Sequence, residues 1–421
     1  MSARNVFFVG ALASSVVGAL VACATDDDPI LDELERNVVV PASDAEADAE
    51  ADASDVDGGP CLDCEWFSDT CSGDVLCPNG PFGTADGLDS RVHVTIIRGR
   101  SESDVWVAGA LGALAHFDGA SWRRSDVGAK ESIRGLWLRD SAEVSLVALE
   151  RLFARGMDFP DAGDGGSAST DGWTPGPTPA HSKEYARFVR TLRSAWASPG
   201  ASHLWGAVES LCGGVNQEPG GDFGCLLSPP SSRSGLWRLR RTGEGTFEIR
   251  EGMSSALCQQ IGCGAMSGIH GASADDLWAV GPSGTAIRIT GADGDAPTFR
   301  RYNTQTWTSL EAVWAASASD AWAVGAQGTV RRYRGHDFLW EIVADLPTTA
   351  NLHAVWGSST SDVWAVGDAA TVLHYDGTAW SRVKIAGLEG RRPSLTAVWV
   401  PSPGHVWIGG QGVVLSLGGK P

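Results

Sequence analysis

Residues 352–380 read LHAVWGSSTSDVWAVGDAATVLHYDGTAW, and this stretch decides the fold. Short apolar runs are separated by turn-forming residues, which is typical of β-strands. We expect strands at 352–356, 363–366 and 371–375 and a fourth at Trp380. Asp376-Gly377 before the last strand predicts a hairpin, because Asp-Gly supplies the positive φ angles of a tight turn. The stretch therefore predicts a four-stranded antiparallel sheet.

The same pattern recurs along the rest of the chain. We count seven copies, two of them degenerate: 96–122, 133 onward, 192 onward, 267–289, 310–333, 352–380 and 395–417. The second tryptophan of the four clearest copies recurs at intervals of 44, 42 and 43 residues. A period in the low forties with short strands is typical of one blade of a β-propeller. We therefore predict an all-β, seven-bladed β-propeller of four-stranded antiparallel blades over residues 94–421.

Tryptophan is unusually frequent, and its positions follow the repeat. Sixteen of the 18 tryptophans fall at recurring places: on the first strand, on the second, or on or near the fourth. Each buried ring removes roughly 150–250 Å² from water. Packing between blades explains these residues; a platform for stacking sugars is the alternative.

The last copy ends at Pro421 without a fourth strand, which leaves an open sheet edge. The segment CEWFS around Trp66 precedes the first copy and is similar to SWRR around Trp122. We predict that the strand near Trp66 completes the seventh blade and joins the two ends of the ring.

The amino terminus predicts export. An apolar run from Val6 to Ala24 follows Arg4, and we assign residues 1–22 to a signal peptide; a retained membrane-spanning helix is the alternative. The run ends in LVAC, which resembles a bacterial lipobox. The resemblance implies that Cys23 becomes the first mature residue and carries lipid. We expect a lipoprotein of the cell envelope, anchored to a membrane on the periplasmic or surface side of the outer membrane.

Residues 23–60 hold most of the excess negative charge. From residue 24 this stretch contains 13 carboxylates and one arginine, out of a formal net charge of −19. Such a segment repels itself and stays extended. We interpret it as a disordered tether, with an acidic metal-binding or protein-binding tail as the alternative. The charge balance also makes nucleic acid an unsuitable partner, because phosphate binding needs a basic face.

Eight cysteines remain once Cys23 is assigned to lipid: Cys61, Cys64, Cys71, Cys77, Cys212, Cys225, Cys258 and Cys263. An even number in an exported chain predicts up to four disulfides. The first four lie in a Cys-rich segment, residues 61–93, and we expect them to pair among themselves. Cys61 and Cys64 also fit a redox pair or half a zinc site. We predict structural disulfides, with no metal and no cofactor.

The copies resemble the bacterial repeat propellers near the WD, YVTN and BNR superfamily. The resemblance rests on SDVWAVG and on YDG followed by tryptophan, and it covers roughly residues 94–421. It implies a binding scaffold and, for lipid-anchored members, a place in outer-membrane assembly. Residues 376–380, DGTAW, are similar to the Asp box of BNR repeats but lack an intervening residue. That departure puts a sialidase activity in doubt.

We find no catalytic constellation. Asp104, Asp276, Asp320 and Asp362 all precede the second-strand tryptophan by two residues. We predict that they accept backbone N–H bonds in turns, because they fall on separate blades. His116 and His374 share a third-strand position and are predicted to be structural. The chain has no G-x-S-x-G, H-E-x-x-H or P-loop motif. We therefore predict that the protein is not an enzyme.

Two insertions depart from the repeat and predict a binding site. Residues 209–235 lie between the second and third strands of the third copy, and the connection into the fourth copy holds Cys258 and Cys263. Both should project from the same face, where binding loops on rigid scaffolds lie. The predicted recognition patch comprises Asn216, Gln217, Glu218, Asp222, Phe223, Gln259 and Gln260. The alternative is that these loops are pinned only against proteolysis.

The leading functional prediction is thus a lipid-anchored, non-enzymatic scaffold for a protein or glycan partner outside the cytoplasm. The alternative is a carbohydrate-active hydrolase or lyase that uses the channel face, for which two carboxylates about 5–9.5 Å apart would be needed.

Overall fold

The computed structural model describes residues 64–82, 88–159, 168–186, 189–211, 234–243 and 245–420. The predicted signal peptide, Cys23 and the acidic tether lie outside the described residues. So do Cys61, Cys212 and Cys225 and five residues of the predicted recognition patch, Asn216, Gln217, Glu218, Asp222 and Phe223.

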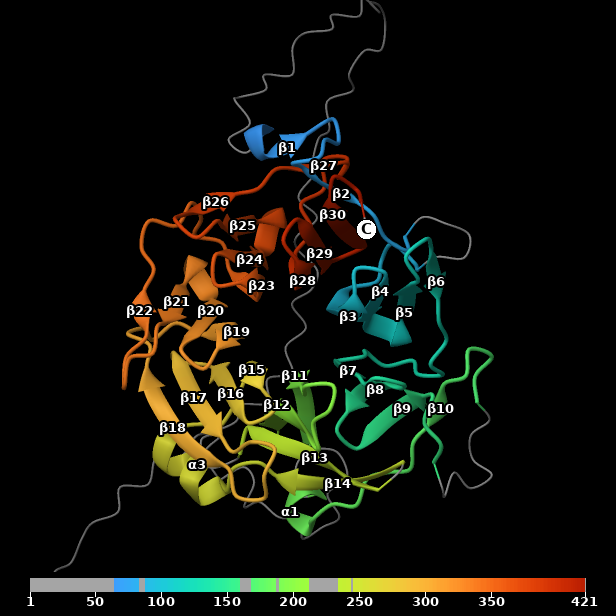
Figure 1. The fold of residues 1–421 in the computed structure, drawn as a ribbon, viewed down its shortest axis with the longest axis vertical. Coiled ribbons are helices and arrows are strands. Elements are labelled where there is room, and N and C mark those ends of the chain that lie inside the picture. Colours follow the sequence, from blue (N-terminus) through green and yellow to red (C-terminus); the bar gives the residue numbers. More distant parts are fainter. Residues whose placement is uncertain are drawn as a thin grey trace, which may run out of the picture. The chain divides into compact units, whose positions relative to one another are not determined.

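Six four-stranded antiparallel sheets stand around a common centre (Figure 1). Within each sheet the strands follow chain order from the innermost to the outermost. The first sheet contains β3 (Val94–Ser101), β4 (Asp104–Gly109), β5 (Leu114–Phe117) and β6 (Trp122–Arg124). The next contains β7 (Gly135–Leu138), β8 (Glu143–Ala148), β9 (Arg151–Arg155) and β10 (Thr174–Pro175), and the third β11 (Val189–Trp196), β12 (His203–Leu211), β13 (Leu236–Gly243) and β14 (Thr246–Glu251).

The three sheets that follow are the most regular. They contain β15 (Gly268–Ser273), β16 (Asp276–Gly281), β17 (Thr285–Thr290) and β18 (Thr298–Asn303); β19 (Leu310–Ser317), β20 (Asp320–Gly325), β21 (Val330–Tyr333) and β22 (Glu341–Ile342); and β23 (Leu352–Ser359), β24 (Asp362–Gly367), β25 (Val372–Tyr375) and β26 (Trp380–Arg382). The strands expected in residues 352–380 are therefore confirmed. Asp376 accepts the N–H groups of Thr378 and Ala379, as the predicted hairpin turn requires.

The remaining strands form one six-stranded mixed sheet in the order β1-β27-β2-β30-β29-β28. It contains β1 (Phe67–Ser68), β2 (Leu76–Pro78), β27 (Ile385–Ala386), β28 (Leu395–Ser402), β29 (His405–Gly410) and β30 (Val413–Leu417). The prediction of seven four-stranded blades is therefore wrong in its count: six sheets have that form. The chain adds two short strands to the outside of the last sheet, and β27 pairs in parallel with β1 and β2.

The predicted closing strand is also wrong in its place. Trp66 lies in a 3₁₀ turn, η1 (Cys64–Trp66), and the adjoining β1 pairs with β27 rather than with the last strand. The strand that pairs antiparallel with β30 is β2, where Leu76 is opposite Leu417. The segment around Trp66 resembles a fourth strand in sequence, but this resemblance was misleading. Strand pairing here depends on contacts with residues more than 300 positions away in the chain.

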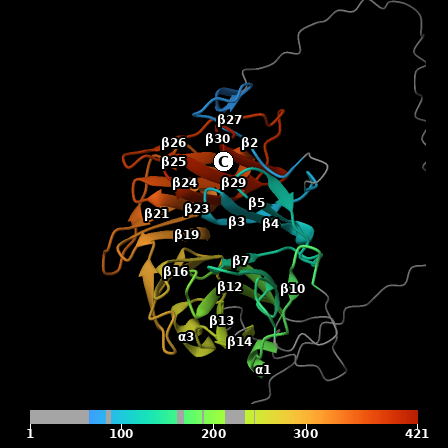
Figure 2. The ribbon, with the colours of Figure 1, turned by 45° about the vertical axis from the view of Figure 1, so that its right-hand side comes forward.

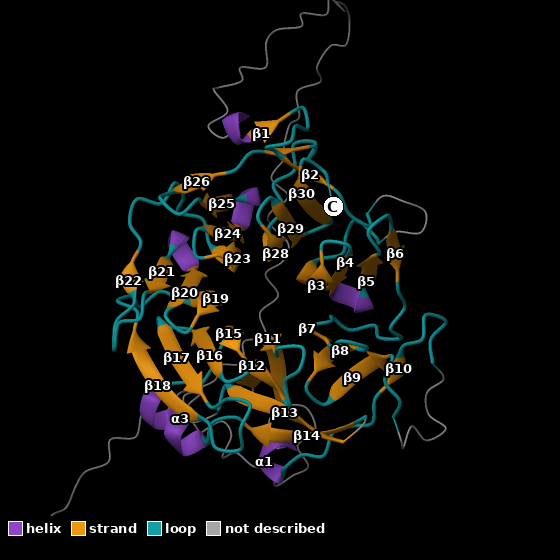
Figure 3. Cartoon of the chain, in the orientation of Figure 1, coloured by secondary structure: helices purple, strands orange, loops and turns teal. Residues whose placement is uncertain are grey.

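Helices and 3₁₀ turns occupy connections between strands (Figure 3). Helix α1 (Lys183–Ala186) precedes β11, and helix α3 (Ser255–Ile261) links β14 to β15. The turns η2 (Ala110–Gly112), η4 (Ala326–Gly328) and η5 (Asp368–Ala370) each join the second strand of a sheet to the third. Figures 1 and 2 both place β2 and β27 on one side of the ring and α3 on the other.

The second strand of each regular sheet is buried on both faces, because other sheets pack on either side. In β20, residues from Ala321 to Gly325 are all buried. Gly325 has no room for a side chain, since a Cβ atom there would lie 2.0 Å from the carbonyl oxygen of Ser309. The recurring glycine therefore lets the start of β19, the inner strand of the same sheet, lie close against the end of β20.

Tryptophan rings connect neighbouring sheets. The ring of Trp278 on β16 lies 4.8 Å from that of Tyr333 at the end of β21, and Trp322 on β20 lies 4.9 Å from Tyr375 at the end of β25. The contact recurs across the first and last sheets, where Trp407 lies 5.5 Å from Phe117. Nine tryptophans are fully buried: Trp106, Trp137, Trp173, Trp205, Trp237, Trp278, Trp322, Trp340 and Trp407. The predicted packing role is confirmed for eight of them; Trp237 is also buried but lies outside the repeat positions.

Two predicted disulfides are present. Cys71 pairs with Cys77 beside β2, and Cys258 pairs with Cys263 around the end of α3. Cys64 is disulfide-bonded as well.

Candidate functional site

Of the predicted recognition patch, the structure describes Gln259 and Gln260, which lie exposed on α3. The insertion at 209–235 does join the second strand of its sheet, β12, to the third, β13. At the base of this insertion the N–H of Gly235 donates to the carbonyl of Cys263. The base of the insertion and the segment after α3 are therefore in direct contact.

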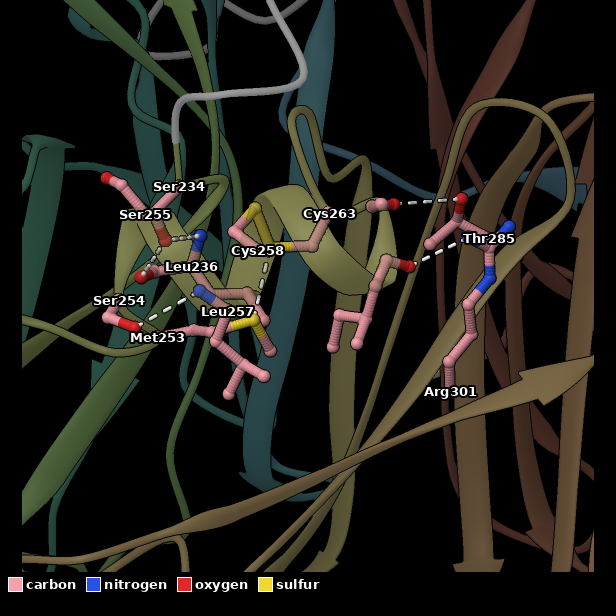
Figure 4. The surroundings of a disulfide bond; sticks show 12 residues. Ser234, Leu236, Met253, Ser254, Ser255, Leu257, Cys258, Cys263, Thr285 and Arg301 are labelled. Atoms are coloured by element: carbon pink, nitrogen blue, oxygen red, sulfur yellow. Dashed lines mark hydrogen bonds between the residues drawn. A yellow bond between two sulfur atoms is a disulfide. The ribbon is translucent and has the colours of Figure 1, made fainter. Parts of the chain in front are cut away.

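Helix α3 is fixed at both ends (Figure 4). Ser254 caps its amino terminus by accepting the N–H of Leu257, and Gly262 ends it in the left-handed conformation at φ 77°. The sulfur atoms of Cys258 and Cys263 are buried against Met253. A cap of this kind stabilises a helix by about 1 kcal/mol. The disulfide thus holds a short helix in place while Gln259 and Gln260 face solvent.

The carboxyl end of α3 contacts the next sheet. The guanidinium of Arg301 on β18 donates to the carbonyl of Ile261 over 2.7 Å, and the hydroxyl of Thr285 donates to that of Gly262 over 3.4 Å. Both side chains point toward the end of the helix in Figure 4. The carboxyl end of α3 is therefore hydrogen-bonded directly to β17 and β18.

A groove lies beyond this contact, which we call the rim groove. Its volume is about 570 Å³, and it lies where β18 meets the connection between β21 and β22. It is lined by Ser283, Gly284, Arg301, Tyr302, Asn303, Thr304, Gln305, Thr306, Trp307 and Phe338.

The rim groove carries two exposed aromatic side chains. Trp307 is 87% exposed and Phe338 is 52% exposed, whereas nine other tryptophans are fully buried. Large apolar side chains that remain in water and flank a groove are typical of binding sites. Trp307 is also one of the two tryptophans that fall outside the repeat positions. That departure was the sequence signal for this site, and the sequence interpretation did not use it.

Hydrogen bonds hold the loop that presents Trp307. The hydroxyl of Thr304 donates to the carbonyl of Gly284 over 2.6 Å, and the amide of Gln305 donates to that of Trp340 over 2.7 Å. Arg331 donates to the carbonyl of Thr304 over 2.7 Å. The loop is thus ordered before any ligand arrives, which lowers the entropic cost of binding.

The recurring aspartates have a different role from the predicted one. Each is bonded to a third-strand side chain 12 residues later. Asp276 accepts two bonds from Arg288, Asp320 accepts two from Arg332, and His116 and His374 lie within hydrogen-bond distance of Asp104 and Asp362. The predicted backbone N–H bonds in the turn are not their main contact. The 12-residue spacing of an acid and a basic side chain was readable in the sequence.

Each of these basic side chains also covers the second-strand tryptophan. The rings of His116 and His374 stack at 4.2 Å on Trp106 and Trp364. Arg332 lies 4.4 Å over Trp322, and its Nη1 donates to the hydroxyl of Tyr375 in the next sheet over 3.2 Å. The structural role predicted for His116 and His374 is confirmed.

The pKa values of these aspartates follow from their surroundings. Burial raises the pKa of Asp362, but bonds from His374, Ser358 and Trp364 outweigh it and hold the pKa below its ordinary value. The same balance, with bonds from His116 and Arg100, lowers the pKa of Asp104. These carboxylates are ionised and engaged.

Among the described residues, no three His, Cys, Asp or Glu side chains are placed to hold a metal ion. In the same part of the chain, no helix has the length and apolar character that a membrane crossing needs.

Known proteins resemble this chain in fold. No protein-family description matches it, and no curated protein is similar by sequence. YCF48 bound to a D1 peptide matches with a TM-score of 0.53 at 12% identity, covering 81% of this chain and 97% of that one. Streptogramin B lyase matches with the same score, identity and coverage. The WD40 β-propeller domain of Doa1 gives a TM-score of 0.50 at 7% identity, covering 82% and 96%. These likenesses establish that the chain is a β-propeller.

Proposed function

We propose that the protein is a non-enzymatic scaffold that binds an extended segment of a partner protein in the rim groove. The observation that carries this proposal is Trp307, which is exposed in water on a loop fixed by hydrogen bonds. A solved β-propeller of similar fold is bound to a peptide, which supports a protein partner.

Trp307 and Phe338 suit apolar side chains of such a segment. Exposed tryptophan on a rigid element contributes strongly to binding, because a large apolar area is buried at a small entropic cost. Gln259 and Gln260 on α3 lie beyond Arg301 and extend the surface that a longer segment could contact.

Replacing Trp307 by alanine is expected to weaken peptide binding at least ~10-fold, the size of a typical interface hot spot. The probe is a display library of unstructured twelve-residue peptides, followed by titration of the enriched sequences. Leu111→Ala is the control, because Leu111 is 77% exposed but belongs to the β4–β5 connection. Equal binding by Trp307→Ala would contradict the proposal. If no peptide is enriched but a glycan array shows binding that depends on Trp307, the ligand of the rim groove is a glycan and not a peptide.

We also propose that the protein is a lipoprotein, attached through Cys23 to the outer membrane on its periplasmic or surface side. The string LVAC and the carboxylate-rich residues 24–60 support this. Cells that express the full chain and are fed an alkyne fatty acid should label the parent protein, while Cys23→Ser should not be labelled. Label that persists in Cys23→Ser would refute the anchor.

We further propose that the six-stranded sheet serves as a seventh blade that closes the ring, with β2 as its fourth strand. The pairing of β2 with β30 supports this, and the first prediction of the Discussion tests it.

A further inference from the structure

The inner strands of all the sheets surround a central cavity of about 120 Å³. A single water molecule needs roughly 10–15 Å³, so the cavity has room for a small organic ligand. Its wall contains residues from β3, β11, β15, β19, β23 and β28, together with Arg134 just before β7. We call this the channel cavity.

Three arginines line the channel cavity, from three successive sheets: Arg98, Arg134 and Arg193. Arg98 donates to the carbonyl of Ile97 over 2.7 Å, and its guanidinium carbon lies 4.2 Å from the ring centroid of Trp356. Burial lowers the pKa of Arg98 to about 10, so it keeps its charge at neutral pH.

None of these three arginines forms an ion pair within the described residues. Burial, followed by repulsion from Arg193, lowers the pKa of Arg134. By contrast, Arg288 and Arg332 on the third strands each have a carboxylate partner at 2.7 Å. The channel arginines therefore differ from those that hold the sheets together.

The other side chains of the cavity do not balance this charge. Glu311 is the one carboxylate among the described residues that line it, and no ion pair joins it to an arginine there. His353, which also lines the cavity, lies 2.8 Å from the carboxylate of Asp368 outside the lining, so that carboxylate already has a partner. His270 accepts the N–H of Ala315, and its pKa is held well below its ordinary value by burial and by Arg98, so it is neutral at pH 7.

Arg98 and Arg134 are partly buried, whereas Arg193 is exposed. A partly desolvated guanidinium group without an ion-pair partner is costly, and a ligand carboxylate that pairs with it relieves that cost. Guanidinium groups bind planar carboxylates with two parallel hydrogen bonds. We propose that the channel cavity is a second binding site, which takes a carboxylate group through Arg98, Arg134 and Arg193. The carboxylate belongs either to a small organic acid or to the end of a peptide chain.

The test uses the full chain and measures binding by calorimetry at low ionic strength. The probes are succinate, its neutral diamide, and acetyl-Ala-Ala with either a free or an amidated end. We expect succinate or the free-acid dipeptide to bind and both neutral probes to fail. The probe that binds identifies the source of the carboxylate. No binding by either acid overturns the proposal.

The test variant is Arg134→Gln combined with Arg193→Gln, which should weaken the acid at least tenfold. Its matched control is Arg123→Gln with Arg334→Gln, which removes the same charge from side chains that are 77% and 58% exposed. If both double variants weaken acid binding equally, the effect is general charge attraction and the proposal is overturned.

The test double should also melt no lower than the parent protein in the absence of ligand, because repulsion between the arginines is relieved. A clearly lower melting temperature would show that the arginines are structural and would overturn the proposal. Trp307→Ala should leave acid binding unchanged, which separates this site from the rim groove.

Discussion

Replacing Leu76 by aspartate is expected to lower the free energy of unfolding by at least about 4 kcal/mol. Leu76 is fully buried on β2 and packs in a cluster with Ile385, Leu395 and Leu415. The substitution both removes this packing and puts a carboxylate where water is absent. Loss of β2 would also expose the edge of β30, so we expect the variant to self-associate. Urea unfolding and light scattering measure the two effects.

Leu111→Asp is the control for this experiment. Leu111 is exposed and has a φ of 58°, a conformation that aspartate tolerates better than leucine. We expect no loss of stability there. If Leu76→Asp unfolds at the same urea concentration as the parent, β2 does not belong to the cooperative unit and the closing role proposed for it is wrong.

Asp320→Ala is expected to cost about 3 kcal/mol of stability, because removal of one partner leaves a buried charge unpaired. The side chains of Asp320 and Arg332 are 14% and 11% exposed. The double variant with Arg332→Met should recover part of the loss, since it removes the orphaned guanidinium and keeps contact with Trp322. Chemical denaturation of the two single variants and the double gives the coupling energy.

The matched control lies in the same sheet. Glu341 is 56% exposed and lies 3.8 Å from Arg334, so Glu341→Ala should change stability by less than about 0.5 kcal/mol. A loss of that small size in Asp320→Ala would show that the buried pair contributes no more than a surface pair.

The sequence predicted the parts of the fold that depend on local pattern. The strands of residues 352–380 and the Asp-Gly turn were correct, because alternation and turn chemistry act over a few residues. The position of the fourth strand of the last sheet was predicted wrongly, because β2 has only three residues and its partner, β30, is at the other end of the chain. The insertion of β27 into the same sheet left no sequence signal that we recognise.

The residues of the candidate sites were harder to predict from the sequence than the strands. Gln259 and Gln260 were placed correctly on an exposed, disulfide-pinned connection, because spacing and cysteines are visible in sequence. Trp307 was not singled out, since exposure depends on which surfaces surround the loop in space. The channel arginines were missed for the same reason: Arg98, Arg134 and Arg193 share no motif, and only the ring of inner strands brings them together.

The contact between a second-strand tryptophan and an aromatic side chain of the following sheet has a further consequence. Trp278 meets Tyr333, Trp322 meets Tyr375 and Trp407 meets Phe117, so the same kind of contact joins neighbouring sheets at three interfaces of the ring. A duplicated unit of this kind would bring with it both sides of the contact that joins it to a similar neighbour. The architecture is therefore suited to growth by tandem duplication, and the three similar units between residues 310 and 417 have the form that such copying would leave.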